Sequence, residues 1–310
     1  MKTPRRAVWR RPPGGLPATV GAWLAYAERL YARHGLALGQ VAATAHDEAL
    51  YLLLRTLGLP LESDARVLRR RVAPAEQAQL EAVLRRRVID RVPAAYLTRE
   101  AWLGPWSFYV DERVIIPRSY FLEVIPGQLA HWLPNHGAGV RRVADLCTGS
   151  GCLAVLLAKQ FPQARVDATD LSPAALEVAA INVRRHRLGR RLHLYQGDLL
   201  AALPAGAMYD VLLSNPPYEP SALVDGQAPE FAAEPRLAHD GGRDGLDLIR
   251  RLVRGAAARL KPHGILVLEI GGLRPAIDRE FAALQPHWLP TEDGTDSVCL
   301  FHAARLGGRH

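Results

Sequence analysis

Residues 215–218, Asn-Pro-Pro-Tyr, directly follow an apolar run, Tyr209–Ser214, that is typical of a buried strand. Proline lacks the backbone N–H that a sheet requires, so the strand must end at Asn215. The Asn215 side chain then offers a carbonyl oxygen, and Pro216 offers a backbone carbonyl oxygen. These acceptors suit the two hydrogens of a planar amino group, and Tyr218 can lie against the flat face of the group that carries it. The alternative is a loop that only ends a strand.

Polar residues also end three other segments that read as strands. The first ends at Asp145 and runs into a turn that contains Gly149 and Gly151. These glycines let the backbone approach a ligand and leave free amides at the start of the next helix. The second segment ends at Asp170, whose carboxylate suits a ribose diol, and the third leads to Asp198, which can accept from an adenine amino group. Taken singly, the glycines fit a plain tight turn, Asp170 a helix cap and Asp198 a turn.

Alternating strands and helices from Arg141 onward must position these residues. The alternation predicts an α/β fold with a mainly parallel sheet, helices on both faces and a terminal antiparallel hairpin after Pro286. The carboxyl ends of parallel strands meet at one edge, so all four polar strand ends should lie together.

The N-terminal part has a different pattern, with three amphipathic helices. The first should run from Thr19 to Gly35 and the second from Thr44 to Gly58. The third, in PAEQAQLEAVLRRRVID, should turn its leucines and valines inward and its arginines outward. We therefore expect a disordered basic tail, a helical domain, a β-hairpin linker and a catalytic domain, with boundaries at residues 1–17, 18–95, 96–117 and 118–306.

Composition and charge narrow the class of protein. The chain of 310 residues is 49% hydrophobic and 23% charged, with neither a secretory signal nor a membrane-spanning run. Its three cysteines form no CxxC pair, which favours a reducing cytoplasm, and no metal site is visible. Residues 1–117 hold 18 Lys/Arg against 11 Asp/Glu and so carry seven of the eight net positive charges. The basic runs at 66–71 and 85–87 are either a solvated helix face or a surface for a polyanionic partner.

The set of strand ends resembles a class I S-adenosylmethionine-dependent methyltransferase, a Rossmann-like fold. The turn after Asp145 lacks the full GxGxxG spacing, which argues against a dinucleotide enzyme. The stretches VIIPRSYFLEVI and AEPRLAHDGGRDGLDLIRRL, with the helical bundle and the hairpin, are similar to the protein glutamine N5-methyltransferases (HemK-like) over residues 18–305. The stretches HDEALYLLLRTLGLP, DLCTGSGC and LEIGG resemble the ribosomal-protein branch (PrmB type) more than the release-factor branch. The chain departs from the family pattern at Glu219-Pro220 and at RSYFLEV.

The resemblance implies roles for individual residues. The glutamine would be surrounded by Asn215, Pro216, Pro217 and Tyr218. The pocket would be bordered by Pro117 and Arg118. The S-adenosylmethionine site would be formed, without a metal, by Asp145, Thr148, Gly149, Ser150, Gly151, Asp170, Asp198 and Asn215.

The resemblance also implies a function, methylation of a glutamine nitrogen in a large-subunit ribosomal protein, protein three of that subunit. The alternatives are methylation of release factors, methylation of an exocyclic amino group in RNA or DNA, and a ribosome-assembly factor that acts by binding. The substrate would be met free or within an assembly intermediate that contains ribosomal RNA. We expect a cytoplasmic enzyme with no membrane partner and no sequence-specific DNA binding.

Overall fold

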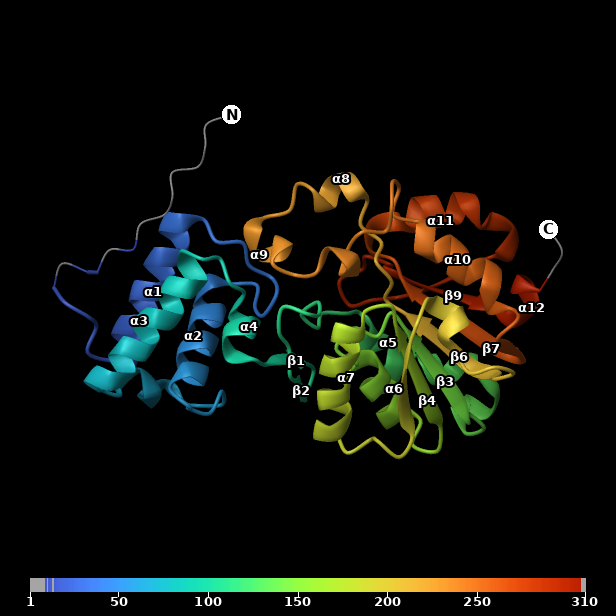
Figure 1. Cartoon of the computed structure of the whole chain (residues 1–310), viewed down its shortest axis with the longest axis horizontal. Helices are drawn as coiled ribbons and strands as arrows, with labels where there is room; N and C mark the ends of the chain where they lie inside the picture. Colours follow the sequence, from blue (N-terminus) through green and yellow to red (C-terminus); the bar gives the residue numbers. More distant parts are fainter. Residues whose placement is uncertain (1–8, 10, 13, 308–310) are drawn as a thin grey trace. The chain divides into compact units, whose positions relative to one another are not determined.

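The computed structural model describes residues 9, 11–12 and 14–307. The chain divides into two compact units, whose helices and strands are drawn in Figure 1. The helical unit comprises residues 1–101 and 227–233, and the sheet unit comprises residues 102–226 and 234–310. The chain therefore passes between the units three times. A short segment that follows Asn215-Pro-Pro-Tyr in the sequence belongs to the helical unit.

Among the described residues, the helical unit is built on five α-helices and a short 3₁₀ helix around one apolar core. α1 begins at the N-cap Thr19 and ends at Gly35, and α2 begins at the N-cap Thr44, as the sequence predicts. Trp23, Leu52 and Leu84 are among its fully buried side chains. The elements are α1 (Val20–His34), α2 (Ala45–Thr56), η1 (Ala65–Arg69), α3 (Pro74–Val88), α4 (Ala94–Thr98) and, from the returning segment, α9 (Pro229–Ala232).

One prediction for α3 is wrong, because Arg87 faces the core. Its side chain is fully buried, and its Nε donates to Glu48 Oε1 at 2.7 Å. Glu48 and Glu230 are buried as well, and Glu230 also receives Arg91 Nη1 at 2.7 Å. A buried cation needs an acid and hydrogen bonds, and the two glutamates supply them here. The basic run at 85–87 is therefore only partly a solvated face.

The described part of the tail also differs from the expected disorder. Trp9 Nε1 donates to Glu81 Oε1 at 3.1 Å, and the Arg11 guanidinium binds both oxygens of Glu81. Trp9 also stands edge-on to Tyr26 of α1. These contacts fix residues 9 and 11 against the helices, while residues 1–8, 10 and 13 lie outside the described part.

The sheet unit contains a mainly parallel sheet of seven strands among the described residues, in the order β5-β4-β3-β6-β7-β9-β8. The first five of these strands are parallel, and β9 pairs antiparallel with both β7 and β8, so the predicted terminal hairpin is present. The hairpin around Gly104-Pro105 forms the separate pair β1 (Ala101–Leu103) and β2 (Trp106–Phe108). The large sheet comprises β3 (Arg142–Leu146), β4 (Arg165–Asp170), β5 (Leu192–Gln196), β6 (Tyr209–Ser214), β7 (Leu260–Glu269), β8 (His287–Leu289) and β9 (Val298–His302).

Helices cover both faces of this sheet and give three layers (Figure 1). Residues alternate along each strand, so Val211 and Leu213 of β6 belong to the core beneath α5 and α6, while Leu212 belongs to the core beneath α10. This is the class I methyltransferase arrangement that the sequence predicts. The helical elements of the unit are α5 (Phe121–Gly127), η2 (Leu129–Trp132), η3 (Pro134–Gly137), α6 (Cys152–Gln160), α7 (Pro173–Arg185), η4 (Leu199–Ala202), α8 (Ser221–Val224), η5 (Arg236–Ala238), α10 (Asp247–Ala256), η6 (Gly271–Leu273), α11 (Arg274–Glu280), η7 (Ala282–Leu284) and α12 (Ala303–Leu306).

Within the described residues, no helix has the length and apolar character that crossing a membrane requires. The same part of the chain contains no cluster of histidine, cysteine and acidic side chains that could hold a metal ion.

Candidate active site

The carboxyl ends of β3 and β4 form one half of the site. Both oxygens of Asp170 accept backbone hydrogen bonds, from Gly149 at 2.8 Å and from Ser172 at 2.9 Å. Gly149 has φ +53°, and a Cβ there would meet only Ile115, at 3.9 Å. The turn therefore needs glycine for its backbone conformation, and the space above it is open. Burial raises the pKa of Asp170, while the two N–H donors oppose this shift.

Asp145 lies below this turn and is fully buried. Its Oδ2 accepts from the hydroxyl of Thr148 at 2.5 Å, whereas its Oδ1 has no hydrogen-bond partner among the described residues. Burial raises the pKa of Asp145 to about 7. An orphaned buried acceptor is costly unless a donor reaches it. Asp145 could therefore satisfy a cationic or N–H donor, either directly or through a water molecule.

The other residues predicted around the cofactor differ from one another in burial and in their polar partners. Ser150 is buried, and its backbone carbonyl accepts from the side chain of Asn182 at 2.9 Å, which fastens the turn to α7. Gly151 begins α6 with φ +79°. Asp198 follows β5 but is exposed, and its carboxylate pairs with Arg251 of α10. An adenine amino group would therefore have to share Asp198 with that guanidinium.

Asn215 is held by a glutamate that sequence reasoning missed. Its Nδ2 donates to Oε1 of Glu269 at 2.9 Å, and the hydroxyl of Ser119 donates to Oε2 of the same carboxylate. The sheet register explains this contact, because Ser214 pairs with Leu268 and so sets the next residues, Asn215 and Glu269, side by side. Since the amide nitrogen faces Glu269, the Asn215 Oδ1 is left as the free acceptor.

Burial raises the pKa of Glu269 to about 7, from an ordinary value of 4.5. Hydrogen bonds from Ser119, Asn215 and the backbone of Tyr120 and Phe121 oppose this shift. The carboxylate is thus poised to change its charge near neutral pH, directly behind Asn215.

The loop at 239–246, here called the glycine loop, packs against residues 217–218. A Cβ at Gly241 would lie 2.7 Å from the Cα of Tyr218 and 2.8 Å from the carbonyl oxygen of Pro217. The backbone of Glu219 exchanges hydrogen bonds with His239 and Gly241, each 2.9 Å long. Only a residue without a side chain fits such a close approach, so the glycine loop fixes the strand end on one side.

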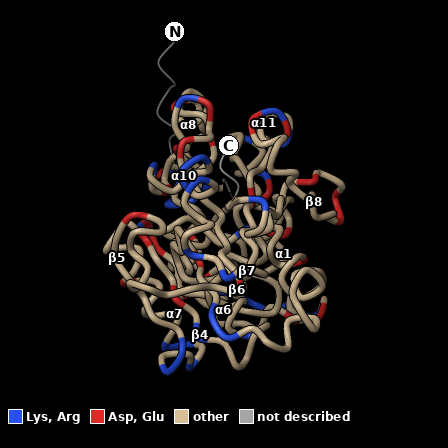
Figure 2. Tube along the Cα trace, turned by 90° about the vertical axis from the view of Figure 1, so that its right-hand side faces the viewer, with Lys and Arg blue, Asp and Glu red and all other residues tan. Residues whose placement is uncertain are grey.

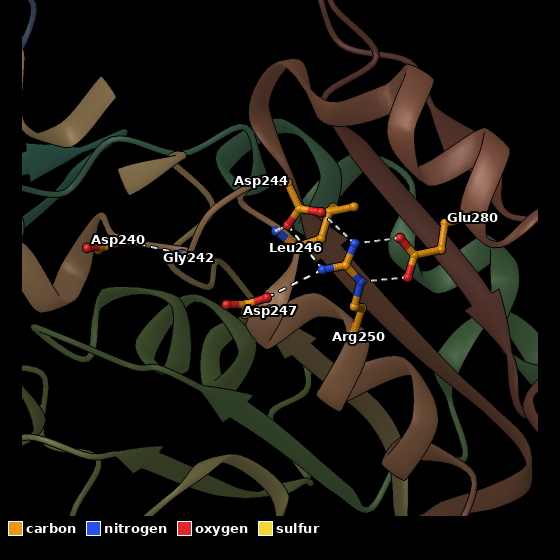
Figure 3. Close-up of polar contacts among 7 residues, drawn as sticks. All are labelled: Asp240, Gly242, Asp244, Leu246, Asp247, Arg250 and Glu280. Atoms are coloured by element: carbon orange, nitrogen blue, oxygen red, sulfur yellow. Dashed lines mark hydrogen bonds and ion pairs between the residues drawn. The ribbon is translucent and has the colours of Figure 1, made fainter. Parts of the chain in front are cut away.

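Arg250 of α10 anchors the glycine loop in turn (Figure 3). Its guanidinium donates to both oxygens of Asp244 in the loop and to both oxygens of Glu280 in α11. Asp244 also accepts from the N–H of Leu246 at 3.1 Å, and Asp240 from that of Gly242 at 3.0 Å. This network ties the loop to two helices and thereby supports the position of Tyr218.

Arg118 lies beside the buried Pro117 and forms a two-pronged ion pair with Glu234, with both distances 2.7 Å. Glu234 also accepts from the backbone N–H of Ile116 and contacts His239 Nε2 at 2.8 Å. These contacts hold the pKa of Glu234 at about 2, against the opposing effect of its burial. Arg118 therefore fastens the chain that leads back to the glycine loop, and the structure gives Pro117 no polar role.

Comparison with known proteins fixes the family. The methyltransferase small domain model matches residues 128–231. The chain is 44% identical to the ribosomal protein uL3 glutamine methyltransferase of Burkholderia pseudomallei, over 93% of this chain and 95% of that protein. The proteins of the same name from Bordetella pertussis and Neisseria gonorrhoeae are 47% and 41% identical, over 87% and 94% of this chain and 90% and 96% of their own length. The chain belongs to the ribosomal protein uL3 glutamine methyltransferase family.

A methyltransferase of this family uses S-adenosylmethionine, and the residues of the first half-site fit that molecule. The buried, unpartnered Oδ1 of Asp145 suits the positive charge of its amino group. The carboxylate of Asp170 retains acceptor capacity for a ribose diol, and the turn at Gly149 leaves room above the backbone.

The signal that could have revealed Glu269 was present in the sequence. It is the last residue of β7, and the rule that polar strand ends line the site applies to it as it does to Asp145. The glycine loop could not be found in this way, because its contact with Tyr218 joins residues far apart in the chain and depends on tertiary packing.

A first prediction concerns Asp170. We expect Asp170→Ala to weaken binding of S-adenosylmethionine and of its demethylated product alike, by about 1–3 kcal/mol, because both contain the ribose. Isothermal titration calorimetry with each ligand measures the effect. Unchanged affinity for both would remove Asp170 from the cofactor site. Glu177→Ala, on an exposed side chain of α7, serves as a matched control that should bind both ligands normally.

A second prediction concerns the charge of Glu269. We expect turnover of the wild-type enzyme to rise as pH increases through about 7, because the ionised carboxylate is the better acceptor for Asn215. Glu269→Gln should lower turnover about tenfold at alkaline pH, equivalent to about 1.4 kcal/mol, and flatten this rise. The pH profile of kcat, measured for both proteins, tests it. Asp145 also titrates near 7, so any rise left in the variant reports on that residue.

The free energy of unfolding of the wild-type enzyme should fall as pH increases, whereas its turnover should rise. A folded-state pKa above the unfolded value means that wild-type stability falls as pH rises from 4.5 to about 7. The Gln variant lacks this charge and should lose less stability over the same range. A variant with the wild-type pH profile for both turnover and unfolding would show that Glu269 does not titrate there.

Proposed function

We propose that this enzyme methylates the side-chain nitrogen of a glutamine in ribosomal protein uL3. The names of its full-length relatives support this substrate. One structural observation carries the chemistry, the amide of Asn215 turned by Glu269 so that its Oδ1 is the open acceptor. That acceptor is followed by Pro216 and Pro217, which have no N–H to compete with the N–H groups of a substrate amide.

In this proposal, residues 215–218 bind and orient the glutamine amide. The Oδ1 of Asn215 and the carbonyl of Pro216 accept the two N–H bonds, which fixes the nitrogen and directs its lone pair. S-Adenosylmethionine, when bound, supplies the methyl group as a sulfonium. The hydrogen bonds to Asn215 and Pro216 strengthen as the nitrogen gains positive charge, so they stabilise the transition state more than the ground state. The nitrogen then releases a proton to solvent, and no strong base is required.

Two further side chains support this arrangement. Tyr218 packs at the end of β6 and can cover the flat face of the amide. Burial is the main cause that raises the pKa of Tyr218, and the nearby charges of Glu269 and Glu219 raise it further. Glu269 contacts Asn215 and not the substrate, so it is a positioning residue whose negative charge polarises the Asn215 amide.

The decisive experiment compares possible substrates directly. The purified enzyme and labelled S-adenosylmethionine are incubated with purified uL3, with release factors and with nucleic acid, and the modified residue is located by mass spectrometry. We expect one methylated glutamine in uL3. Label in release factors or in nucleic acid instead would overturn the substrate, and binding to uL3 without transfer would favour an assembly factor.

We further propose that the enzyme acts in the cytoplasm, on uL3 in an assembly intermediate that contains ribosomal RNA. The net charge of +8 supports such an encounter. A ribosomal protein is itself usually basic, so attraction to the RNA explains the charge better than attraction to the protein.

A further inference from the structure

Five arginines line the amino-terminal edge of the large sheet, opposite the site. Arg142 begins β3 and pairs in register with Arg165, which begins β4. The backbone carbonyl of Arg141 accepts from the N–H of Arg165 at 2.9 Å, and that of Arg191 accepts from Val166 at 2.8 Å. Arg190 directly precedes Arg191 in the chain. Neighbouring strands lie about 4.8 Å apart, so the arginines of adjacent strands start about one strand spacing from each other.

The end of α7 adds three more arginines to this edge. Arg184 and Arg185 form its last turn, and Arg187 lies in the short connection to β5. Figure 2 shows blue segments gathered at the lower end of the tube, near the labels of α7 and β4. We call the whole set the arginine edge, which comprises Arg141, Arg142, Arg165, Arg184, Arg185, Arg187, Arg190 and Arg191.

Few acids neutralise this edge. Asp167 is buried and takes both Arg142 and Arg165, at 2.7 and 3.0 Å. Asp210 is also buried and is occupied by Lys261 and His263. Arg141 and Arg191 donate to backbone carbonyls, which leaves their charge in place. The other four arginines are exposed and form no ion pair within the described part of the chain, namely Arg184, Arg185, Arg187 and Arg190.

The two edges of the sheet differ in how their charges are paired, because Asp198, Asp240 and Asp244 at the carboxyl edge are matched by Arg251, Arg236 and Arg250. The carboxyl edge carries the acids already described, namely Asp145, Asp170, Asp198, Asp240, Asp244 and Glu269. The dipole of α7 favours cations only in its last turn, so it accounts for Arg184 and Arg185 and not for Arg187 or Arg190. A row of unpaired guanidinium groups suits successive phosphates, which arginine binds in a two-pronged manner.

The helical unit is a weaker candidate for such a surface. Arg66 pairs with Asp64, Arg70 with Glu76, and Arg11 with Glu81, at 2.5–2.6 Å. Arg87 is buried. Several arginines of the basic runs are therefore paired or buried, and fewer of them are available to an anionic partner.

We propose that the arginine edge binds the phosphate backbone of RNA and so holds the enzyme with its carboxyl edge, where the site lies, turned away from that backbone. This inference deepens the proposed encounter with RNA-associated uL3, but it is tested without methylation. Binding through phosphates would be independent of sequence and would weaken with salt.

The test compares two variants that lose the same charge. Arg184→Gln, Arg185→Gln, Arg187→Gln and Arg190→Gln are combined in one protein, and Arg69→Gln, Arg71→Gln, Arg85→Gln and Arg86→Gln in the matched control. Binding of a fluorescein-labelled RNA hairpin is followed by anisotropy at several salt concentrations. We expect the first variant to bind the RNA at least tenfold more weakly. The slope of log affinity against log salt should become less steep by about 3, because each of the four lost phosphate contacts contributes about 0.7–0.9 to that slope. The control should stay close to wild type.

Three outcomes would overturn the proposal. The first is wild-type affinity and salt slope in the sheet-unit variant, and the second is an equal loss in both variants, which would reflect net charge alone. The third is loss of binding to vesicles of anionic phospholipid with RNA binding unchanged. Methylation of free uL3 should persist in the variant that lacks Arg184, Arg185, Arg187 and Arg190. Failure of the proposed function would be seen separately, because the wild-type enzyme would then not methylate uL3.

Discussion

Asn215→Ala is expected to lower kcat/KM for the glutamine substrate roughly 30- to 1000-fold. This loss is equivalent to about 2–4 kcal/mol of transition-state stabilisation. The substitution removes the acceptor oxygen that Glu269 holds in place, and it also leaves the Glu269 carboxylate without one of its donors. Affinity for S-adenosylmethionine should fall much less. Steady-state kinetics with uL3 and calorimetry with the cofactor measure the two effects.

Asn215→Asp separates the two functions of the amide. It retains an acceptor oxygen but replaces the N–H donor with a second carboxylate oxygen facing Glu269. We expect turnover to be impaired at neutral pH and to recover in part as pH falls, because one of the two carboxyls then takes a proton. Equal losses of cofactor affinity and turnover in Asn215→Ala would show that the residue serves the cofactor and not the glutamine.

Arg87→Met is expected to destabilise the helical unit by about 3–5 kcal/mol. The substitution leaves Glu48 buried without its guanidinium partner, while Glu230 keeps Arg91. Amide hydrogen exchange along α3 reports on this unit alone, which matters because unfolding of a protein with two units need not be a two-state process. The logarithm of the exchange rate should rise in proportion to the lost free energy.

Two controls make this result specific. Arg85→Met, on the exposed side of the same helix, should change stability by no more than about 0.5 kcal/mol. Combining Arg87→Met with Glu48→Leu removes both charges and should recover most of the loss. Similar exchange rates in Arg85→Met and Arg87→Met would contradict the assigned role of the buried ion pair.

Local signals predicted the elements of this protein well. The N-caps Thr19 and Thr44 each start a helix, because a side-chain oxygen satisfies an amide that the first turn leaves free. Parallel pairing then brings Asp145 and Asp170 to one edge, which follows from the direction of the strands alone.

The errors concern contacts between distant residues. Arg87 lies three residues after Leu84, on the apolar face of α3, but its charge favoured an outward position. Only Glu48, on another helix, makes its burial tolerable. In the same way, the partner of Asn215 lies 54 residues further along the chain. Side-chain periodicity gives the face of an element, and tertiary packing decides which polar group completes it.

The return of residues 227–233 to the helical unit has a consequence for how the protein can be divided. A fragment that starts at Trp102 would still carry Glu230, but without Arg87 and Arg91, the cations that pair with it. A fragment that ends at Ala101 would keep those arginines and lose the acid. Neither half is therefore a self-sufficient module, and a chimera between relatives would have to exchange two separate stretches of the gene together.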